Sequence, residues 1–557
     1  MTRWRTGKVL TAVAVAGVGW GATGQAEQET DRTVVSTESG AVRGVVSGQT
    51  RTFRSIPYAA PPEGDRRWRD PEPPEPWTGV RDATSPAPAC AQGEGEIPGG
   101  SVEEDCLYLN VTTPAKASTK PKPVIVWVHG GGFYMGASRS YPADRLVAGG
   151  DVVVVTVNYR LGVFGFFGHP ELPGSGTFGL ADQQAAFGWV RGNITEFGGD
   201  PRNVTIAGQS AGGISNCAHL TSPRAAGLFD KAVLQSGSCD MAWKANAEYR
   251  GQPADAIFEP LERVEQLGSE TATELDCART DANATLDCLR ALPVDALMPV
   301  QQRFIQPAYG TRLLPTNPAD AIRAGRFHRV PVLAGQNHDE ATLSTSMYDN
   351  FQYPMSEQTY QAVLSETFGA DRPAVEARYP RDAYDSAALA WSAITTDSKW
   401  TCTQYATTSK LARRVPVYHY EFADPAAPPI SPLPPTMPLG SYHSAELWSL
   451  FNLANIEPRL TESQRQLSNQ LIDYWSSFAS TGNPNGAPGP RWPEFGDANR
   501  PHVLSLAPGP DCVHPVDLAT DHQCQFWAVP PNKLGARNRV QIAAWAWQNN
   551  IAKTTTH

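Results

Sequence analysis

The stretch Asn203-Val-Thr-Ile-Ala-Gly-Gln-Ser-Ala-Gly-Gly213 decides how the fold of this chain is interpreted. It has the pattern of a short apolar strand, a tight turn and the start of a helix. The turn, Gly208 to Gly212, is the only match to G-x-S-x-G in the chain. In that pattern a strained turn presents the hydroxyl of the central serine, here Ser210, to a cleft. The alternative interpretation is a Gly/Ser turn with no chemical role.

Further apolar runs lie on both sides of this stretch, separated by segments with helical periodicity such as 181–197. Continuous apolar runs are typical of parallel strands that are covered on both faces. We therefore predict an α/β fold with a mainly parallel central sheet flanked by helices, and with reactive groups at the carboxyl ends of the strands. Besides the run before Gly208, the predicted strands are 124–128, 152–155, 231–236, 330–335 and 415–420.

The remaining segments are predicted from their local patterns. Residues 33–46 alternate apolar and polar side chains around two glycines, which indicates an N-terminal hairpin. Residues 240–330 and 340–410 are predicted to be long, mostly helical insertions. Residues 461–480 are predicted to form a helix that buries Leu467, Leu471, Trp475 and Phe478.

Composition and charge exclude several classes of protein. The formal net charge is -10, which disfavours binding to a phosphate backbone, so no nucleic-acid partner is expected. No 20-residue apolar segment follows the N-terminus, so no membrane span is expected. Residues 1–26 combine a basic start, a short apolar core and a last segment, Gly24-Gln25-Ala26, with small residues at the usual positions for cleavage, which is the pattern of a secretory signal peptide. The alternative is a buried N-terminal helix. Because no linker divides 27–557, we predict that it is a single domain. The signal pattern predicts that this domain is secreted to the extracellular space or periplasm.

The chain has nine cysteines, an odd number. In an exported protein this indicates several disulfides and at least one remaining thiol. Two pairs flank short loops, Cys90 with Cys106 and Cys277 with Cys288, but spacing alone leaves their pairing open. The chain has no CxxC pair and no HExxH motif, so we predict no metal site and no cofactor.

A serine nucleophile needs a base within hydrogen-bond reach and a carboxylate that orients this base. On a fold with this turn the three groups follow in the order serine, acid, histidine. Asp339 and Glu340 lie beyond the predicted strand 330–335, and physical reasoning does not choose between them. His443 follows on a loop after a Pro-rich segment, so it is the candidate base among eleven histidines.

Ester or amide chemistry at Ser210 also needs amide donors for the oxyanion of the tetrahedral intermediate. Gly130-Gly131-Gly132 can point backbone N–H groups inward because no side chain obstructs them. The amide of Ala211 is a further candidate donor. A phosphate-binding loop is the alternative interpretation, but no Gly-Lys-Ser/Thr sequence follows the glycines.

At this point the chain resembles the type-B carboxylesterase and cholinesterase-like lipase family of the α/β-hydrolase superfamily, over nearly its whole mature length. The motifs that carry the resemblance occur in order: Glu104-Asp-Cys-Leu-Tyr-Leu-Asn110, His129-Gly-Gly-Gly-Phe133, Asn158-Tyr-Arg160, Ala181-Asp-Gln183, Trp189-Val190, Asn193-Ile194, Phe197-Gly-Gly-Asp-Pro201, the Ser210 turn, Gln235-Ser-Gly237 and the His443 loop.

The resemblance implies roles for individual residues. Ser210 would be the nucleophile, Glu340 rather than Asp339 the acid and His443 the base. The amides of Gly131, Gly132 and Ala211 would form the oxyanion hole. The disulfides implied are Cys90–Cys106, Cys277–Cys288 and Cys402–Cys524, with Cys512 as a rival partner in the last pair. We add Cys217–Cys239 as a prediction that the resemblance does not supply.

Three departures from the family pattern bear on the substrate. Gln209 stands where the family usually has Glu, which should weaken attraction for cationic substrates. Ala341 follows the acid where Gly is usual. Residues 91–105 contain no aromatic residue, whereas cholinesterases bind quaternary ammonium groups there with a tryptophan.

We therefore predict a secreted serine carboxylesterase acting on a small-molecule ester through an acyl-enzyme. The resemblance places Phe304 and the Leu313-Leu314 stretch near the acyl group of the substrate. The alternatives are a lipase of the same family and a catalytically silent binding or adhesion module. Sequence leaves the natural ester and the oligomeric state open.

Overall fold

The computed structural model describes residues 33–116, 118–350, 353–429, 436–486, 489–496 and 502–528. All of them fall within one compact unit, which starts at Thr33. The signal peptide predicted for 1–26 lies outside the described residues. None of the helices within the described ranges is long and apolar enough to cross a membrane.

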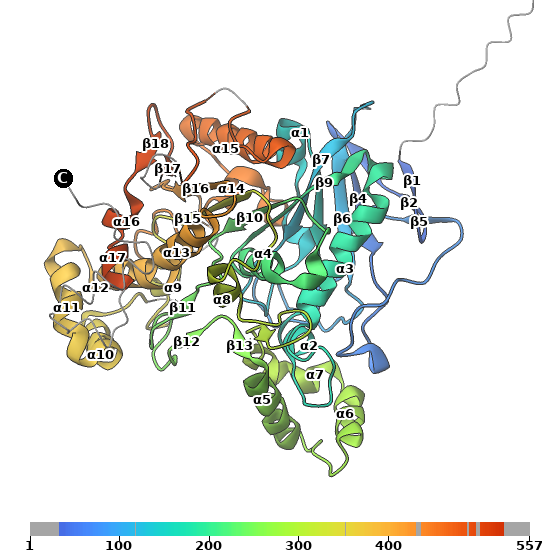
Figure 1. Cartoon of the computed structure of the whole chain (residues 1–557), viewed down its shortest axis with the longest axis horizontal. Helices are drawn as coiled ribbons and strands as arrows, with labels where there is room; N and C mark the ends of the chain where they lie inside the picture. The colour runs from blue at the N-terminus through green and yellow to red at the C-terminus, as the bar shows by residue number, and fades with distance from the viewer. Residues whose placement is uncertain are drawn as a thin grey trace, which may run out of the picture. The chain divides into compact units, whose positions relative to one another are not determined.

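One large sheet of eleven strands organises the described chain (Figure 1). Every pairing from β17 through to β8 is parallel. The pairings at the two edges are antiparallel. The predicted mainly parallel sheet is therefore confirmed. The strands are, in spatial order, β18 (Val513–Val516), β17 (Val503–Leu506), β16 (Val417–Phe422), β15 (Val332–Asn337), β10 (Lys231–Gln235), β9 (Gly199–Gln209), β7 (Lys122–Val128), β8 (Val153–Val157), β6 (Tyr108–Pro114), β4 (Thr50–Pro57) and β3 (Val45–Ser47).

Both faces of the sheet are buried, which explains why its central strands are apolar without alternation. In β7, Val124 and Val126 face one hydrophobic core, whereas Ile125 and Trp127 face the other. The first core packs under α3 (Phe178–Asn193), α4 (Ala211–Thr221) and α13 (Cys402–Leu411). The second packs under α1 (Asp144–Gly150), α14 (Leu447–Leu450) and α15 (Glu462–Thr481), which lie together on the opposite side of the sheet (Figure 1).

The carboxyl ends of the central strands line up at one edge. Gln209 at the end of β9 pairs with Gln235 of β10, and Gln235 pairs in turn with Gly335 of β15. Asn337, at the end of β15, pairs with Phe422 of β16. The loops that follow these strands therefore converge, as the sequence predicts for the reactive groups.

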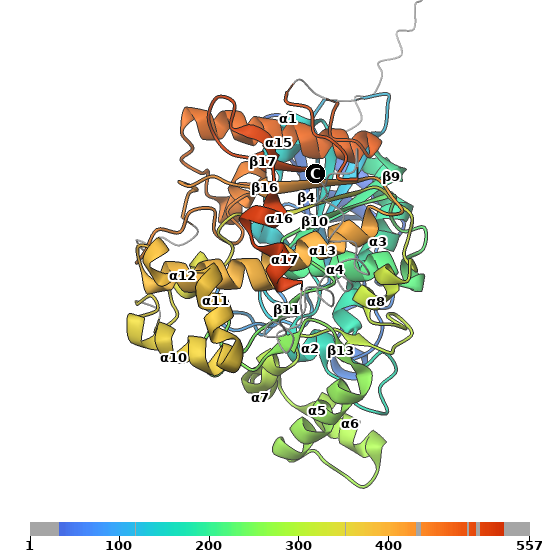
Figure 2. The same ribbon diagram turned by 60° about the vertical axis from the view of Figure 1, so that its left-hand side comes forward.

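The second insertion, 340–410, is mostly helical, as expected (Figure 2). The first, 240–330, is not: it combines helices with long loops and the short strands β11 (Ala242–Trp243), β12 (Asp255–Ala256), β13 (Glu259–Pro260) and β14 (Ala308–Tyr309). The first contains α5 (Leu261–Glu274), α6 (Ala282–Ala291) and α7 (Val294–Leu297). The second contains α10 (Glu357–Phe368), α11 (Arg372–Arg378) and α12 (Ala387–Thr395), followed by the π-helical turn η8 (Thr396–Thr401) that leads into α13. At the N-terminal end, β1 (Val34–Thr37) and β2 (Gly40–Arg43) form the expected hairpin, to which β5 (Val80–Asp82) adds.

Two predicted helices have different bounds from those expected. The helix predicted for 181–197 begins at Phe178, and its last turn is the 3₁₀ segment η3 (Ile194–Phe197), which ends at Gly198 with φ 90°. The helix predicted for 461–480 begins after Thr461, which forms a capping box with Gln464, and ends before Gly482 with φ 78°.

Four disulfides are present among the described residues: Cys90–Cys106, Cys217–Cys239, Cys277–Cys288 and Cys402–Cys524. Cys512 is a free, partly exposed thiol and is therefore not the partner of Cys402. The Cys402–Cys524 bridge ties the chain's last described helix, α17 (Cys524–Trp527), to the start of α13.

Candidate active site

Ser210 occupies the turn between β9 and α4 in a strained backbone conformation, with φ 56° and ψ −124°. The turn holds this conformation because its peptide groups are bonded on both sides. The amide of Ser210 donates to the carbonyl of Gln235 at 2.8 Å, and the Ser210 carbonyl accepts from Ile214 at 2.9 Å. A Cβ on Gly212 would lie 2.0 Å from the Val128 carbonyl oxygen, so this position requires glycine.

The glycine loop after β7 packs directly against the serine turn. A Cβ on Gly130 would lie 3.1 Å from the Cβ of Ser210. Gly131 and Gly132 adopt φ values of +100° and +61°, which favour glycine. Within the described part of the chain, no acceptor bonds the amides of Gly131, Gly132 or Ala211. These amides are therefore available to an oxyanion beside Ser210.

His129, the first residue of this loop, holds its backbone in place. Its Nδ1 lies 2.8 Å from the carbonyl oxygen of Gly130, and its ring stacks on Tyr159 with centroids 4.4 Å apart. Burial lowers the pKa of His129 to about 4, so the ring is neutral at physiological pH and Nδ1–H can donate to the carbonyl.

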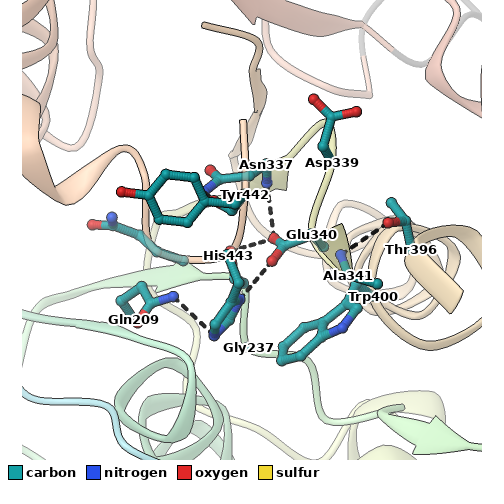
Figure 3. Close-up of polar contacts among 12 residues, drawn as sticks. Gln209, Gly237, Asn337, Asp339, Glu340, Ala341, Thr396, Trp400, Tyr442 and His443 are labelled. Carbon is teal, nitrogen blue, oxygen red and sulfur yellow. Dashed lines mark hydrogen bonds and ion pairs between the residues drawn. The ribbon is translucent and has the colours of Figure 1, made fainter. Parts of the chain in front are cut away.

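Glu340 and His443 meet beside the serine turn (Figure 3). His443 Nδ1 lies 2.5 Å from Glu340 Oε2. The carboxylate is fully buried, and its other oxygen accepts from the Ser236 hydroxyl at 2.6 Å and the Asn337 amide at 2.8 Å. Three donors therefore fix this carboxylate in place.

Asp339, the other acid that sequence reasoning left open, has different partners. Its carboxylate lies 2.9 Å from His338 Nδ1 and accepts from the amide of Ser441 at 2.9 Å. Burial raises the pKa of Asp339, but the hydrogen bond and charge of His338 outweigh this and lower it overall. Of the two adjacent acids, the structure brings Glu340 to His443.

The second nitrogen of His443 faces the serine turn. His443 Nε2 lies 3.2 Å from the side-chain amide Nε2 of Gln209, the residue before Ser210. The amide donates, so His443 Nε2 is the acceptor and Nδ1 carries the proton toward Glu340. This is the tautomer that a general base needs. Among the described contacts, the Ser210 hydroxyl makes no hydrogen bond to His443; such bonds are commonly long in ligand-free enzymes and tighten with substrate.

A second buried carboxylate lies behind the first. Glu446 accepts from Asn337 Nδ2 at 2.7 Å and from Gln235 Nε2 at 3.1 Å. Burial raises the pKa of Glu446, and the nearby charge of Glu340 raises it further. Asn337 thus binds both carboxylates, one through its backbone amide and the other through its side chain.

Sequence reasoning missed four residues that support His443 and Glu340. Ser236 lies in a motif that was recognised, but its bond to the acid gives no local signal. Trp400, whose ring contacts that of His443, comes from the second insertion and has no distinguishing pattern. Asn337 and Glu446 lie near the predicted acid and base in sequence, so their positions could have suggested a role.

Phe304 is buried, and its ring packs on Phe167 with centroids 5.1 Å apart. Its proposed place in the acyl pocket stays a prediction.

One group of side chains has the composition of a metal site. His338, Glu421 and His522 offer atoms within 4.8 Å of one another. However, both nitrogens of His522 bond carboxylates, Nδ1 to Asp397 at 2.6 Å and Nε2 to Glu421 at 2.7 Å. Burial lowers the pKa of His522, but these two partners outweigh it and raise the pKa to about 10. The group is therefore an ion pair built on an imidazolium.

Comparison with known proteins shows the family of this chain. The carboxylesterase family profile matches residues 31–527. The para-nitrobenzyl esterase of Bacillus subtilis (strain 168) is 36% identical over 489 residues, which cover 85% of this chain and 94% of that protein. The cocaine esterase of Homo sapiens is 33% identical, over 87% of this chain and 88% of that protein.

The similar solved structures are also esterases. A PNB esterase superposes with a TM-score of 0.70 at 32% identity, covering 88% of this chain and 99% of the other. A thermophilic PNB esterase superposes with a TM-score of 0.72 at 30% identity and the same coverage. The predicted α/β-hydrolase fold and the predicted reaction class, carboxylic ester hydrolysis, are confirmed. The chain belongs to the carboxylesterase family.

Proposed function

We propose that this enzyme hydrolyses carboxylic esters through a covalent acyl-enzyme formed on Ser210, with His443 as the base and Glu340 as the acid that orients it. The observation that carries the proposal is the 2.5 Å contact between Glu340 Oε2 and His443 Nδ1, which leaves the opposite ring nitrogen beside the serine turn.

In the first half-reaction the Ser210 Oγ attacks the ester carbonyl carbon while His443 Nε2 accepts the hydroxyl proton. The carbonyl oxygen becomes an oxyanion, for which the amides of Gly131, Gly132 and Ala211 are the donors. Each such donor contributes about 3 kcal/mol to stabilising the transition state. The imidazolium then protonates the leaving alkoxide, and the alcohol departs.

In the second half-reaction a water molecule attacks the acyl carbon as His443 accepts its proton. Collapse of the second tetrahedral intermediate returns that proton to Ser210 and releases the carboxylic acid. Glu340 orients the ring of His443 and stabilises the imidazolium, a role that its position, fixed by three hydrogen-bond donors, favours.

We propose an esterase rather than a lipase because the disulfide loop 90–106 packs against the body of the protein. Ile97, in the middle of this loop, is buried against Ala89 and Ala137. A lid for emulsified lipid needs a mobile apolar surface, which this packing disfavours. The relatives named for nitrobenzyl, cocaine and fumonisin esters differ widely in substrate, so a broad range of soluble esters is the substrate class proposed here.

We also propose that the protein is exported and that 27–557 is its single mature domain. The signal pattern of 1–26 supports this, as do four disulfides, which persist in oxidising compartments. N-terminal sequencing of protein recovered outside the cytoplasm tests this, and an intact Met1 would contradict it.

The decisive experiment is hydrolysis of a chromogenic short-chain aryl ester by wild type and by Ser210→Ala. Wild type should show a burst of alcohol release followed by steady turnover, and a phosphonylating inhibitor should add one equivalent of mass to it. Ser210→Ala should lose both. Undiminished turnover in Ser210→Ala would show that another group is the nucleophile. Soluble and emulsified esters, run side by side, test the choice of esterase over lipase.

A further inference from the structure

A cavity of about 420 Å³ opens away from the proposed catalytic residues. Its walls come from the loop before α3, helix α6 of the first insertion, the 3₁₀ turn η4 (Pro223–Ala225) and two further loops, at residues 68–70 and 312–313. None of Ser210, Glu340 and His443 lines it. The volume is in the range of sites that bind small organic molecules.

Helix α4 fixes the separation between this cavity and the serine turn. Ser210 precedes the first residue of α4, whereas Ser222 follows its last. The Ser222 hydroxyl donates to the carbonyl of Leu313, which lines the cavity, at 2.8 Å. The helix has 11 residues, so about 16 Å separate its two ends. The cavity is therefore a different site from the one that carries out hydrolysis.

Its polar lining is strongly cationic. Four arginines, Arg69, Arg224, Arg290 and Arg312, line the cavity together with only two carboxylates, Asp70 and Glu171. The whole chain carries a formal charge of -10, so this local excess of positive charge is opposite in sign to that of the protein. Clustered charge of one sign at a concave surface attracts the opposite ion.

One ion pair and one hydrogen bond leave two of these four guanidinium groups free: Arg290 Nε donates to the carbonyl of Arg67 at 3.2 Å. Arg224 is paired with Asp70 at 2.9 Å. Within the described residues, the side chains of Arg69 and Arg312 have no hydrogen-bond acceptor or ion-pair partner. Burial lowers the pKa of Arg290, and the charge of Arg69 lowers it further, which shows that these two cations repel each other. A bound anion would relieve that repulsion.

The other walls are apolar and rigid. Trp68 and Leu313 are almost fully buried, and Leu172 and Leu286 are buried beside them. Trp68 is held by stacking on Phe167, with centroids 4.6 Å apart, and by an indole N–H that donates to the Val163 carbonyl at 2.8 Å. Pro173, which is exposed, lies over these buried side chains and supplies apolar surface to the cavity. A fully hydrated ion would leave this surface unused, whereas an anion with an apolar body would cover it.

We propose that this cavity is a second binding site, for a small organic carboxylate with an apolar body. The guanidinium groups of Arg69 and Arg312 bind the carboxylate, which matches their planar geometry. The apolar body lies against Pro173, which the buried side chains of Trp68 and its leucine neighbours support from within. The proposal is independent of the chemistry at Ser210, because binding here requires no hydrolysis.

Isothermal titration calorimetry with hexanoate, on the full chain, tests the site. The double variant Arg69→Gln/Arg312→Gln removes the two unpaired cations. The matched control is Arg43→Gln/Arg202→Gln, which loses the same charge at exposed positions outside the cavity. Hexanoate should bind wild type and the control equally, and the double variant at least tenfold more weakly. Should the double variant fail to fold, Arg312→Gln alone, at an exposed residue, should weaken binding severalfold.

Two further probes complete the test: one lacks the charge of hexanoate and the other lacks its apolar body. 1-Hexanol should bind at least tenfold more weakly than hexanoate because it lacks the charge. Inorganic phosphate should also bind more weakly because it lacks the apolar body. Hexanoate binding that is absent from wild type, or unchanged in the arginine variants, overturns the proposal; phosphate binding as tight as hexanoate overturns its ligand class.

Discussion

The indole of Trp400 lies against the imidazole of His443, with ring centroids 4.3 Å apart and planes inclined by 38° (Figure 3). Trp400 belongs to the π-helical turn η8, and the Lys399 ammonium lies 4.5 Å from the indole centroid. π-Helical turns occur frequently at functional sites. The irregular turn thus supplies a flat surface that, together with Glu340, fixes the orientation of the imidazole.

Replacing Trp400 with alanine should therefore lower kcat by about 10- to 100-fold, because a misplaced base costs this much even when its chemistry is unchanged. Trp400→Phe keeps an aromatic surface and should retain most of the activity. Steady-state kinetics with a soluble aryl ester, with circular dichroism to check folding, would measure both. Equal activity in Trp400→Ala and wild type would show that Glu340 alone orients the ring.

The adjacent acids offer a matched pair of variants. Glu340→Gln removes the charge that fixes the tautomer of His443, so kcat should fall by about 10⁴-fold with little change in KM. Asp339→Asn alters a carboxylate that contacts His338 and Ser441 instead, and kcat should stay within a few-fold of wild type. A larger loss in Asp339→Asn than in Glu340→Gln would reverse the assignment of the acid.

The fold could be predicted from sequence because its signals are local and repeated. Continuous apolar runs mark the strands of the parallel sheet, and the Gly208 to Gly212 turn places the serine at a strand end. The turn singles out Ser210, and His443 is the candidate base because it follows the acids on a loop after the Pro-rich segment. The strand pairings and the alignment of strand ends at Gln209, Gln235 and Asn337 agree with that prediction.

The features that the sequence did not predict depend on contacts between residues far apart in the chain. Asp339 and Glu340 differ by one position, and only the direction of each side chain after β15 separates their partners. Trp400 reaches His443 because η8 interrupts the helical insertion, which no periodicity predicts. The cavity arginines come from four separate segments, so no sequence motif unites them.

A charge introduced at Gln209, the residue before Ser210, should change the pH dependence of the reaction. Gln209→Glu would place a carboxylate where a neutral amide now lies 3.2 Å from His443 Nε2. The added charge favours the imidazolium, so the acidic limb of the kcat/KM profile should move up by about one pH unit or more. Activity at neutral pH should fall as a result. Gln209→Met, of similar length and uncharged, is the control and should leave the limb in place.

The same variant should change preference between esters. A carboxylate at this depth attracts a cationic alcohol group, so the kcat/KM for a choline ester should rise relative to that for its uncharged isostere, and high salt should reduce the gain. An unchanged ratio would mean that residue 209 does not contact the alcohol side of the substrate.

His522 gives a prediction about stability rather than catalysis. Its imidazolium lies between Asp397 and Glu421, and Asp397 also accepts from the Tyr379 hydroxyl at 2.7 Å. The ring of His338 lies edge-on to that of His522, with centroids 5.3 Å apart. The contact between His522 and Asp397 links the C-terminal segment to η8, to which Asp397 belongs. His522 lies two residues before Cys524, which the disulfide joins to Cys402.

The pKa of His522 is about 10 in the folded protein and about 6.5 in an unfolded chain. Its contribution to stability is therefore complete below about pH 6.5 and is lost as the pH rises through about 10. His522→Gln leaves two buried carboxylates without their cation, so the free energy of unfolding near pH 6.5 should fall by about 3–5 kcal/mol. The variant should also lose less stability than wild type between pH 6.5 and 10. Urea unfolding across this range measures both, with His514→Gln, at an exposed position in β18, as the control. Parallel curves for wild type and His522→Gln would show that His522 does not titrate as an ion pair.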